Sequence, residues 1–415
     1  MKKILLCVLV VLVLVSLPIL PGCQKSTPTA TKTLTIGGIA FLTGPAASGG
    51  IACKAGWELA ADKYNDAGGL KVGNTYYHIN MITEDDAMSA DQAATMATKL
   101  TQQDGAKFIL GPLVDAEKNV VYPIANQAGA LMWVGDSCNA SQSIKFDGNT
   151  DVKSGKALYC RAQWACDEVT PALLDYLKAN YPNAKKVAVC GITEACVPPF
   201  FDWMQGELAS KGLQRVGALE QIAPDATDYN PAVTRILSSN PDAIDVCVST
   251  PVTWGFVVGA ARSLGFKGPI FCSTHLDVGF TDTIAGGKNT DIFGAGINLT
   301  DMSSLSQDVR DAHAAYLSHG YAAKDEIADV YLVGYNGLWV LLQTIEKAKR
   351  IDPATVEKTY EGLTKKGDLQ TLYGPAYVGG LKTYGVNKVL CEPFWIDSCM
   401  NGVSKNVQQF NIDIP

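Results

Sequence analysis

The chain has 415 residues, of which 47% are apolar, and a formal net charge of −7. This negative charge disfavours nucleic acid and anionic membrane surfaces as partners. A mean hydropathy of +0.08 fits a globular protein. The length exceeds what one compact core accommodates, so two lobes are expected.

The N-terminus has the pattern of an export signal. Lys2 and Lys3 precede an apolar run over residues 4–20. A short basic patch followed by such a run is typical of a signal peptide, here over residues 1–22.

The apolar run ends in L-P-G-C, which is similar to the bacterial lipobox. We therefore expect Cys23 to carry a lipid, and residues 23–32, rich in Ser, Thr, Pro and Lys, to form a flexible tether. The alternative is a single spanning anchor, because the run approaches the ~20 residues that cross a bilayer. Pro18 and Pro21 argue against that continuous helix.

The first part of the mature chain alternates strand and helix patterns. Strands are predicted over 33–41, 77–86, 107–112 and 130–137, and helices over 56–69, 90–105 and 115–129. A glycine-rich stretch, G-P-A-A-S-G-G, lies between the first strand and the first helix. It lacks the lysine and the Ser/Thr of a phosphate-binding loop, so a nucleotide site is not expected there.

The second part of the chain repeats this alternation. Helices are predicted over 170–181, 198–212, 229–240 and 253–265, with a long helical stretch from 306, and strands over 185–191, 215–222, 243–249, 269–274 and 291–298. The tail beyond Leu372 is rich in strand and turn residues. This pattern predicts an α/β protein of two doubly wound parallel-sheet lobes. We place the first lobe at 33–155 and 297–370, and the second at 156–296 and 371–415.

The cysteines have no C-x-x-C spacing, so neither a zinc ribbon nor a thioredoxin motif is indicated, and no metal or other cofactor is expected. Outside the cytoplasm, pairs close in sequence are candidates for disulfides. These pairs are Cys160 with Cys166, Cys190 with Cys196, and Cys391 with Cys399. Cys53 and Cys138 both follow strands of one lobe and form a fourth candidate pair.

Catalytic motifs are lacking, since the chain has no H-E-x-x-H, G-x-S-x-G or Walker lysine. A carboxylate–histidine pair, such as His275 with Asp277, has no serine nucleophile beside it. We therefore expect a binding protein and not an enzyme.

The stretch "FLTGPAASGGIACKAGWELAADKYNDAGGL" resembles the start of the branched-chain-amino-acid type of periplasmic solute-binding proteins. The similarity continues through "EDDAMSADQAATMATKLTQQDGAKFILGP" and "RILSSNPDAIDVCVSTPVTWGFVVGAARSLGFKGPIF". It implies the type I periplasmic binding fold, in which three crossover strands join two lobes that close on a ligand. It also implies the receptor of an ABC importer, a monomer that delivers its ligand to membrane permease subunits.

The resemblance also implies which residues form the ligand cleft. In the first lobe they are Ala47, Ser48, Gly49, Asp115, Ala116, Gly135, Asp136, Ser137 and Cys138. In the second lobe they are Trp164, Cys196, Trp254, His275 and Asp277. The family commonly has a Ser or Thr where this chain has Asp115, and an aromatic residue near the position of Cys196.

These departures leave alternatives open. A carboxylate at Asp115 would repel a ligand carboxylate, or it caps a helix, which is worth ~1 kcal/mol. Asp136 either faces the ligand or pairs with its own turn. Trp164 and Trp254 form either an aromatic wall or ordinary packing.

We therefore expect a lipid-anchored, extracytoplasmic receptor for amino acids or a related small polar ligand. The alternatives are a receptor for an amide, urea-like or aromatic acid ligand, a sensory module and, least favoured, a lipoprotein hydrolase.

Overall fold

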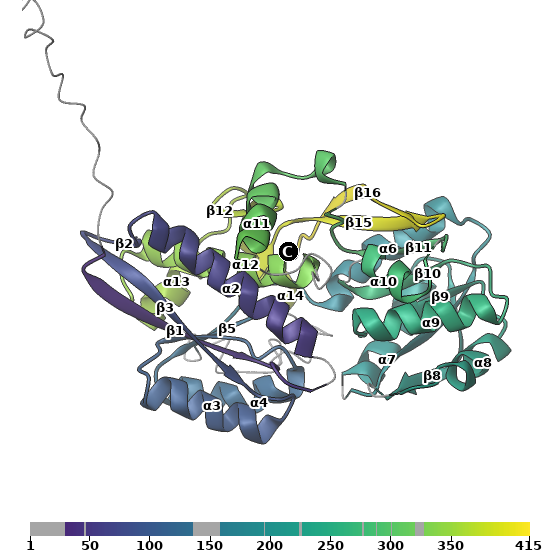
Figure 1. Ribbon diagram of the computed structural model, residues 1–415, viewed down its shortest axis with the longest axis horizontal. Coiled ribbons are helices and arrows are strands. Elements are labelled where there is room, and N and C mark those ends of the chain that lie inside the picture. Colours follow the sequence, from purple (N-terminus) through teal and green to yellow (C-terminus); the bar gives the residue numbers. More distant parts are fainter. Residues whose placement is uncertain are drawn as a thin grey trace, which may run out of the picture.

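The computed structural model describes residues 30–44, 47–135, 158–194, 196–223, 226–275, 278–287, 289–299, 301–319 and 328–415. These residues form two α/β lobes that lie side by side, each built on its own sheet (Figure 1). The predicted fold class is confirmed. The signal peptide and Cys23 lie outside the described residues.

The described part of the first lobe has a nine-stranded sheet in the order β12-β13-β14-β6-β5-β4-β1-β3-β2. Its N-terminal elements are β1 (Lys32–Ala40), α2 (Ala47–Asp66), β2 (Leu70–Val72), β3 (Thr75–Asp85), α3 (Ala90–Gln102), β4 (Phe108–Leu110), α4 (Asp115–Gln127), β5 (Leu131–Val134) and β6 (Tyr159–Arg161). β3, β1, β4, β5 and β6 run parallel to one another, and β2 pairs antiparallel with β3. Later segments complete this lobe: α11 (Gln307–Ser318), α12 (Ala328–Ala348), α13 (Pro353–Glu361), β12 (Leu369–Thr371), β13 (Gly374–Gly379), α14 (Leu381–Tyr384) and β14 (Val389–Cys391).

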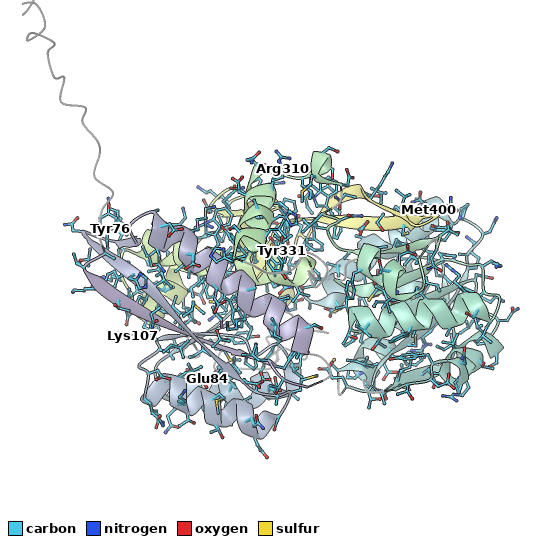
Figure 2. All side chains as sticks on the ribbon, viewed as in Figure 1. Tyr76, Glu84, Lys107, Arg310, Tyr331 and Met400 are labelled. Carbon is cyan, nitrogen blue, oxygen red and sulfur yellow. The ribbon has the colours of Figure 1, made fainter. Side chains whose placement is uncertain are left out.

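The second lobe has a seven-stranded sheet among the described residues, in the order β16-β15-β11-β10-β9-β7-β8. Its elements are α6 (Cys166–Asn180), β7 (Lys186–Ile192), α7 (Val197–Ser210), β8 (Gln214–Ile222), α8 (Asn230–Ser238), β9 (Ala243–Val246), α9 (Pro251–Ser263), β10 (Ile270–His275), α10 (Val278–Ile284), β11 (Ile292–Ala295), β15 (Pro393–Met400) and β16 (Val403–Asn411). The last two form an antiparallel hairpin against β11, and Met400 lies at its half-exposed tip (Figure 2).

The lobe boundaries differ from the predicted ones near 156 and 371. β6 joins β5 in the first sheet, and β14 pairs with β6 while β13 pairs with β14. The chain enters the second sheet only at β15. Strand periodicity shows that a segment is a strand, but not which edge it joins, so the sequence pattern could not decide this.

Helices α2 and α12 pack closely because glycines bring their backbones together. A Cβ on Gly56 would lie 2.0 Å from the carbonyl oxygen of Tyr331, and a Cβ on Gly334 would lie 2.4 Å from that of Cys53. Tyr331 is fully buried near the centre of the molecule, where its ring stacks on that of Tyr316 in α11 (Figure 2). Gly56 is therefore needed for packing.

In the described part of the chain, three segments pass between the two sheets: residues 162–165 after β6, residues 296–299 and 301–306 after β11, and Glu392 between β14 and β15. Glu392 is buried, and burial raises its pKa to about 8. These crossings correspond to the three-strand hinge that the resemblance implies.

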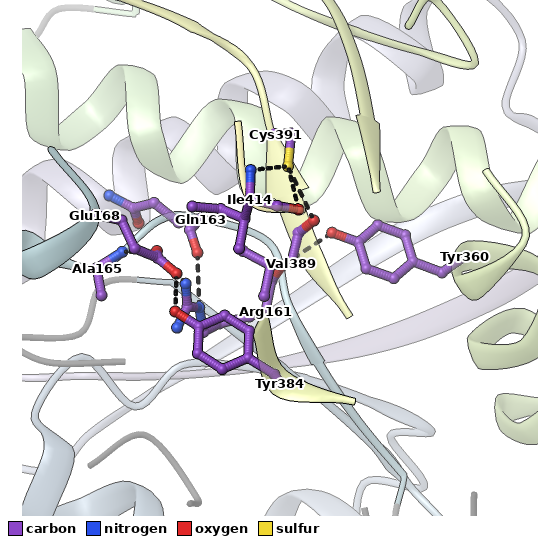
Figure 3. A network of polar contacts seen from close by, with 9 residues as sticks. All are labelled: Arg161, Gln163, Ala165, Glu168, Tyr360, Tyr384, Val389, Cys391 and Ile414. Carbon is purple, nitrogen blue, oxygen red and sulfur yellow. Dashed lines mark hydrogen bonds and ion pairs between the residues drawn. The ribbon is translucent and has the colours of Figure 1, made fainter. Parts of the chain in front are cut away.

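A buried polar network holds the first crossing (Figure 3). The Arg161 guanidinium at the end of β6 forms an ion pair with Glu168 of α6, with side-chain exposures of 0% and 6%. Tyr384 of α14 donates its hydroxyl hydrogen to Glu168 Oε1 at 2.5 Å, and the Tyr360 hydroxyl donates to the Arg161 carbonyl at 2.9 Å. Burial opposes charge on Arg161, but Glu168 outweighs it and the pKa of Arg161 is raised. The network thus ties a helix of the second lobe to the first sheet.

Three predicted disulfides are wrong: Cys160 with Cys166, Cys190 with Cys196, and Cys391 with Cys399. The buried residues Cys53, Cys160, Cys166, Cys190, Cys247, Cys272, Cys391 and Cys399 are not disulfide-bonded. Cys391 ends β14 in the first sheet whereas Cys399 lies in β15 of the second, so closeness in sequence is not closeness in space.

The fourth candidate disulfide is also excluded, because Cys53 is not disulfide-bonded; Cys138 lies outside the described residues. Among the described cysteines, Cys196 is disulfide-bonded. Its partner is not Cys190, because Cys190 is in no disulfide.

None of the helices in the described ranges combines the length and the apolar character of a membrane-spanning segment.

We predict that Glu168→Gln lowers the free energy of unfolding by about 3–5 kcal/mol, because it leaves the buried Arg161 charge without its counterion. Urea unfolding followed by circular dichroism measures this loss. Asp175→Asn is the matched control, since Asp175 pairs with Lys211 on the exposed surface and should cost less than about 1 kcal/mol. Equal losses for the two variants would contradict a structural role for the buried pair.

Candidate functional site

A cavity of about 170 Å³ lies between the two lobes. It opens at the carboxyl ends of strands in both sheets, where ligands of open α/β folds usually bind. Lining residues at or near the carboxyl end of a parallel strand are Phe41, Leu110, Gly111, Gly135, Ile192, Val248 and Thr274. The volume is comparable to the ~150 Å³ apolar cavity that admits benzene, so the site suits a small molecule.

Several helices begin at the cavity. Ser48 and Gly49 in the first turn of α2, Val114 at the N-cap of α4, Cys166 at the start of α6 and Thr250 at the N-cap of α9 all line it. Helix N-termini carry unpaired N–H groups and a partial positive charge. The cavity therefore favours an anionic group such as a carboxylate.

Residues 47–50, the last part of the glycine-rich stretch, form the first turn of α2, which begins nine residues before the predicted start. A Cβ on Gly50 would lie 2.1 Å from the carbonyl oxygen of Phe41, so glycine lets this turn pass over the end of β1. Without that close approach, Ser48 and Gly49 could not reach the cavity.

Three aromatic rings form much of the apolar wall: Phe41, Trp57 and Trp133. Trp133 is held in place, because its Nε1 donates a hydrogen bond to the Gly337 carbonyl at 2.9 Å. Trp57 packs over β1, where a Cβ on Gly38 would lie 2.7 Å from its ring. Such rigid aromatic surfaces bind apolar side chains or ligand rings.

Polar groups among the lining residues are few. Apart from hydroxyl and thiol groups, the polar side chains of the described lining are the amide of Gln163 and the carboxylate of Glu194. Glu194 is the one charged side chain among these described lining residues. Gln163 lies in the first crossing segment, and Glu194 follows β7 of the second lobe. A carboxylate there favours a cationic group on the ligand.

Of the residues that the resemblance implies, Ser48, Gly49 and Gly135 line the cavity. Ala47, Asp115, Ala116 and Cys196 lie close to it in the chain but are not lining residues. His275 ends β10. Asp136, Ser137, Cys138 and Asp277 lie outside the described residues.

Asp115 neither caps α4 nor lines the cavity. It is the first residue of the helix, and the N-cap is Val114, which makes no side-chain capping bond. The buried Lys118 donates a hydrogen bond from Nζ to Asp115 Oδ1 at 2.8 Å. The Asp115 carboxylate is thus already neutralised by its own helix, which removes the repulsion expected from sequence.

Trp164 and Trp254 are both fully buried and are not lining residues. Trp164 packs on Phe394 with ring centroids 4.9 Å apart, and Trp254 lies in the second-lobe core against Gly294. Ordinary packing therefore accounts for both, as the alternative interpretation held.

Sequence reasoning missed Phe41, Trp57, Trp133, Gln163 and Glu194. The rings occupy positions at one-face helical spacing or in apolar strands, which predicts core packing equally well. Gln163 is the residue before Trp164, and Glu194 follows the strand 185–191, so a rule that takes every polar residue after a strand would have found Glu194.

A pair of carboxyl groups lies beside the cavity. Asp86 and Glu117 are almost fully buried, and Met88, two residues from Asp86, lines the cavity. Burial and the neighbouring Asp86 charge raise the pKa of Glu117 to about 8, with a smaller contribution from Glu194. Burial likewise raises the pKa of Asp86. Glu117 therefore keeps its proton at neutral pH.

Within the described ranges, no group of three or more His, Cys, Asp or Glu side chains is arranged to hold a metal ion.

The chain belongs to the periplasmic binding protein family, whose model matches residues 33–381. A Leu/Ile/Val-binding protein of Rhizobium johnstonii is 26% identical over 339 residues, which cover 80% of this chain and 84% of that protein. The protein is thus an extracytoplasmic binding protein that is similar in sequence to the branched-chain-amino-acid type.

Solved structures show the same fold. A leucine-binding protein of Thermotoga maritima has a TM-score of 0.72 at 17% identity, with 91% of this chain and 98% of that chain covered. A solute-binding protein of Rhodopseudomonas palustris, solved with 4-hydroxybenzoate, has a TM-score of 0.71 at 18% identity, with 91% and 97% covered.

We predict that Glu117→Gln flattens the pH profile of stability. A raised pKa in the folded state means that the folded protein binds more protons than the unfolded one between about pH 4.5 and 8, so stability falls as the pH rises through that range. The variant stays neutral and should exceed the wild type at pH 8 by roughly 1–3 kcal/mol. Thermal unfolding from pH 5 to 9 measures the difference.

Asp202→Asn, on the exposed face of α7, is the control and should leave the slope unchanged. A wild-type profile that rises between pH 5 and 8, with no change in Glu117→Gln, would show that Glu117 ionises normally.

Proposed function

We propose that the cavity binds a small amino acid and that closure of the two lobes presents it to the permease of an ABC importer. The observation that carries this proposal is the cavity itself, an apolar space of amino-acid size onto which helix N-termini open from both lobes. The Leu/Ile/Val-binding relative supports the ligand class.

The ligand groups have separate partners in this proposal. The carboxylate accepts hydrogen bonds from the N–H groups at the N-termini of α2 and α9, and the ammonium pairs with Glu194. The apolar side chain packs on Phe41, Trp57 and Trp133. No bond of the ligand changes.

Closure of the two lobes on the ligand follows from the position of the cavity between them. Residues of both lobes line it, so a ligand that contacts both stabilises the closed arrangement by its additional contacts. The crossing segments are the places where such a rotation is absorbed. The closed form is then the form that a permease recognises.

An aromatic acid is the second candidate ligand, and the three aromatic rings of the wall favour it. A solute-binding protein of similar fold binds 4-hydroxybenzoate. Such a ligand has a carboxylate but no ammonium, so it needs the helix N-termini and not Glu194.

The two ligand classes are separated by calorimetry with leucine, isoleucine, valine and phenylalanine against benzoate and 4-hydroxybenzoate. We expect amino acids to bind the wild type, and Glu194→Gln to weaken them roughly 10- to 100-fold through loss of a charge-assisted contact. Glu220→Gln, on β8 in an exposed pair with Arg235, is the control and should not change affinity. Benzoates that bind both proteins equally, without any amino acid binding, would favour the second candidate.

We also propose that Cys23 is lipidated and anchors the protein to the outer face of the cell membrane, with a monomeric receptor beyond the tether. Labelling with a fatty-acid analogue in a bacterial host should mark the wild type and leave Cys23→Ser unlabelled. Cys7→Ser, within the apolar run, should still be labelled. A labelled Cys23→Ser protein would refute the anchor.

Transport and sensing share this binding module. If genes for two permeases and two ATPases were found beside this one, they would support transport, whereas a sensor kinase or chemoreceptor gene there would support signalling.

A further inference from the structure

The amide of Gln163 is a buried polar group at the base of the cavity. Gln163 lies in the first crossing segment, lines the cavity and is 2% exposed. Neither its Oε1 nor its Nε2 has a hydrogen-bond partner in the part of the protein that the structure describes. A buried amide without partners destabilises a fold, so its presence needs a reason.

The surrounding network fixes the main chain that carries this amide. Arg161 Nε donates to the Gln163 carbonyl oxygen at 3.2 Å, and the Ala165 N–H donates to Glu168 Oε2 at 2.6 Å (Figure 3). Arg161 and Glu168 are themselves an ion pair. The residue is therefore anchored on both sides, while its side chain takes no part in the anchoring.

Gly135 leaves room at the amide oxygen. A Cβ on Gly135 would lie 3.1 Å from Gln163 Oε1, and no other described residue beyond its chain neighbours lies within 4 Å of that point. Gly135 also lines the cavity and directly follows β5 of the first lobe. The amide thus stands at the junction of the two lobes.

The chemistry of an amide selects its partner. Nε2 donates and Oε1 accepts. A carboxylate only accepts and an ammonium only donates, so either would leave one atom of the buried amide unsatisfied. A hydroxyl or a carboxamide both donates and accepts, and therefore satisfies both atoms.

We propose that Gln163 is a specificity residue that hydrogen-bonds a neutral hydroxyl or carboxamide of the bound solute, in addition to the carboxylate held at the helix N-termini. This inference rests on the proposed function of the cavity and narrows its ligand class. Solutes with a purely aliphatic side chain leave the amide unpaired and bind less tightly.

Pairs of solutes of similar shape test this preference by calorimetry: threonine against valine, asparagine against leucine, and 4-hydroxybenzoate against benzoate. We expect the wild type to bind the hydroxyl or carboxamide member of at least one pair tenfold or more tightly. Gln163→Leu should reduce that ratio to within threefold, mainly by losing affinity for the polar member.

The unfolding temperature of the ligand-free protein distinguishes a role of Gln163 in binding from a role in holding the fold together. Gln163→Leu removes an unpaired buried amide, so its unfolding temperature should equal or exceed that of the wild type. Gln343→Leu is the matched control, because the Gln343 amide exchanges two hydrogen bonds with the Gln370 main chain, at 2.7 and 3.0 Å. It should lower the unfolding temperature and keep the ligand preference.

Gly135→Ala crowds the amide without removing it and should also weaken the preference. The proposal is overturned if the wild type binds both members of every pair equally, if Gln163→Leu keeps the preference, or if it destabilises the protein as much as Gln343→Leu does. A wild type that binds no member of any pair overturns the proposed function as well, so the two failures are distinguishable.

Discussion

The ion pair of Arg161 and Glu168 is the constraint on which the arrangement of the lobes and of the site depends. It joins the end of a first-lobe strand to the first helix of the second lobe in an environment that excludes water. Two charges are buried only where their geometry is satisfied, and Tyr384 adds the further hydrogen bond that Glu168 needs. Arg161 thereby fixes the main chain at Gln163, since its Nε donates to the Gln163 carbonyl oxygen, and Gln163 is placed at the cavity as a consequence.

Glycine determines how closely the remaining elements approach the ligand site. Gly50 lets the first turn of α2 cross the end of β1, and Gly56 lets the same helix pack against α12. Helix N-termini can then contribute N–H groups from both lobes to one small cavity. The carboxyl groups of Asp115 and Glu117 near the cavity carry no unbalanced charge. Asp115 is paired with Lys118, and Glu117 stays protonated because its pKa is raised. Glu194 therefore supplies the negative charge within the described lining.

Helices and strands with a regular hydrophobic spacing were predicted well, but the elements that they contact in the folded protein were not. The strands before the cavity and the helices after them follow from hydrophobic spacing, whereas the resemblance to the family implied Ser48, Gly49 and Gly135. Trp164 and Trp254 show the limit, since an aromatic residue near a cleft loop has the same pattern whether it packs in a core or faces a ligand. The disulfides show it again: Cys391 and Cys399 are eight residues apart, yet they belong to different sheets.

The sequence by itself determined the α/β class, the two lobes and the family, because these depend on periodicity and on glycine positions that are local to each segment. Only the tertiary structure decided which sheet each C-terminal strand joins, that Asp115 is neutralised by Lys118, and that Gln163 lies unpaired at the cavity. The physical reason is that burial and hydrogen bonding depend on neighbours that are distant in the chain, such as Gln163 and Gly135. No local pattern contains that information.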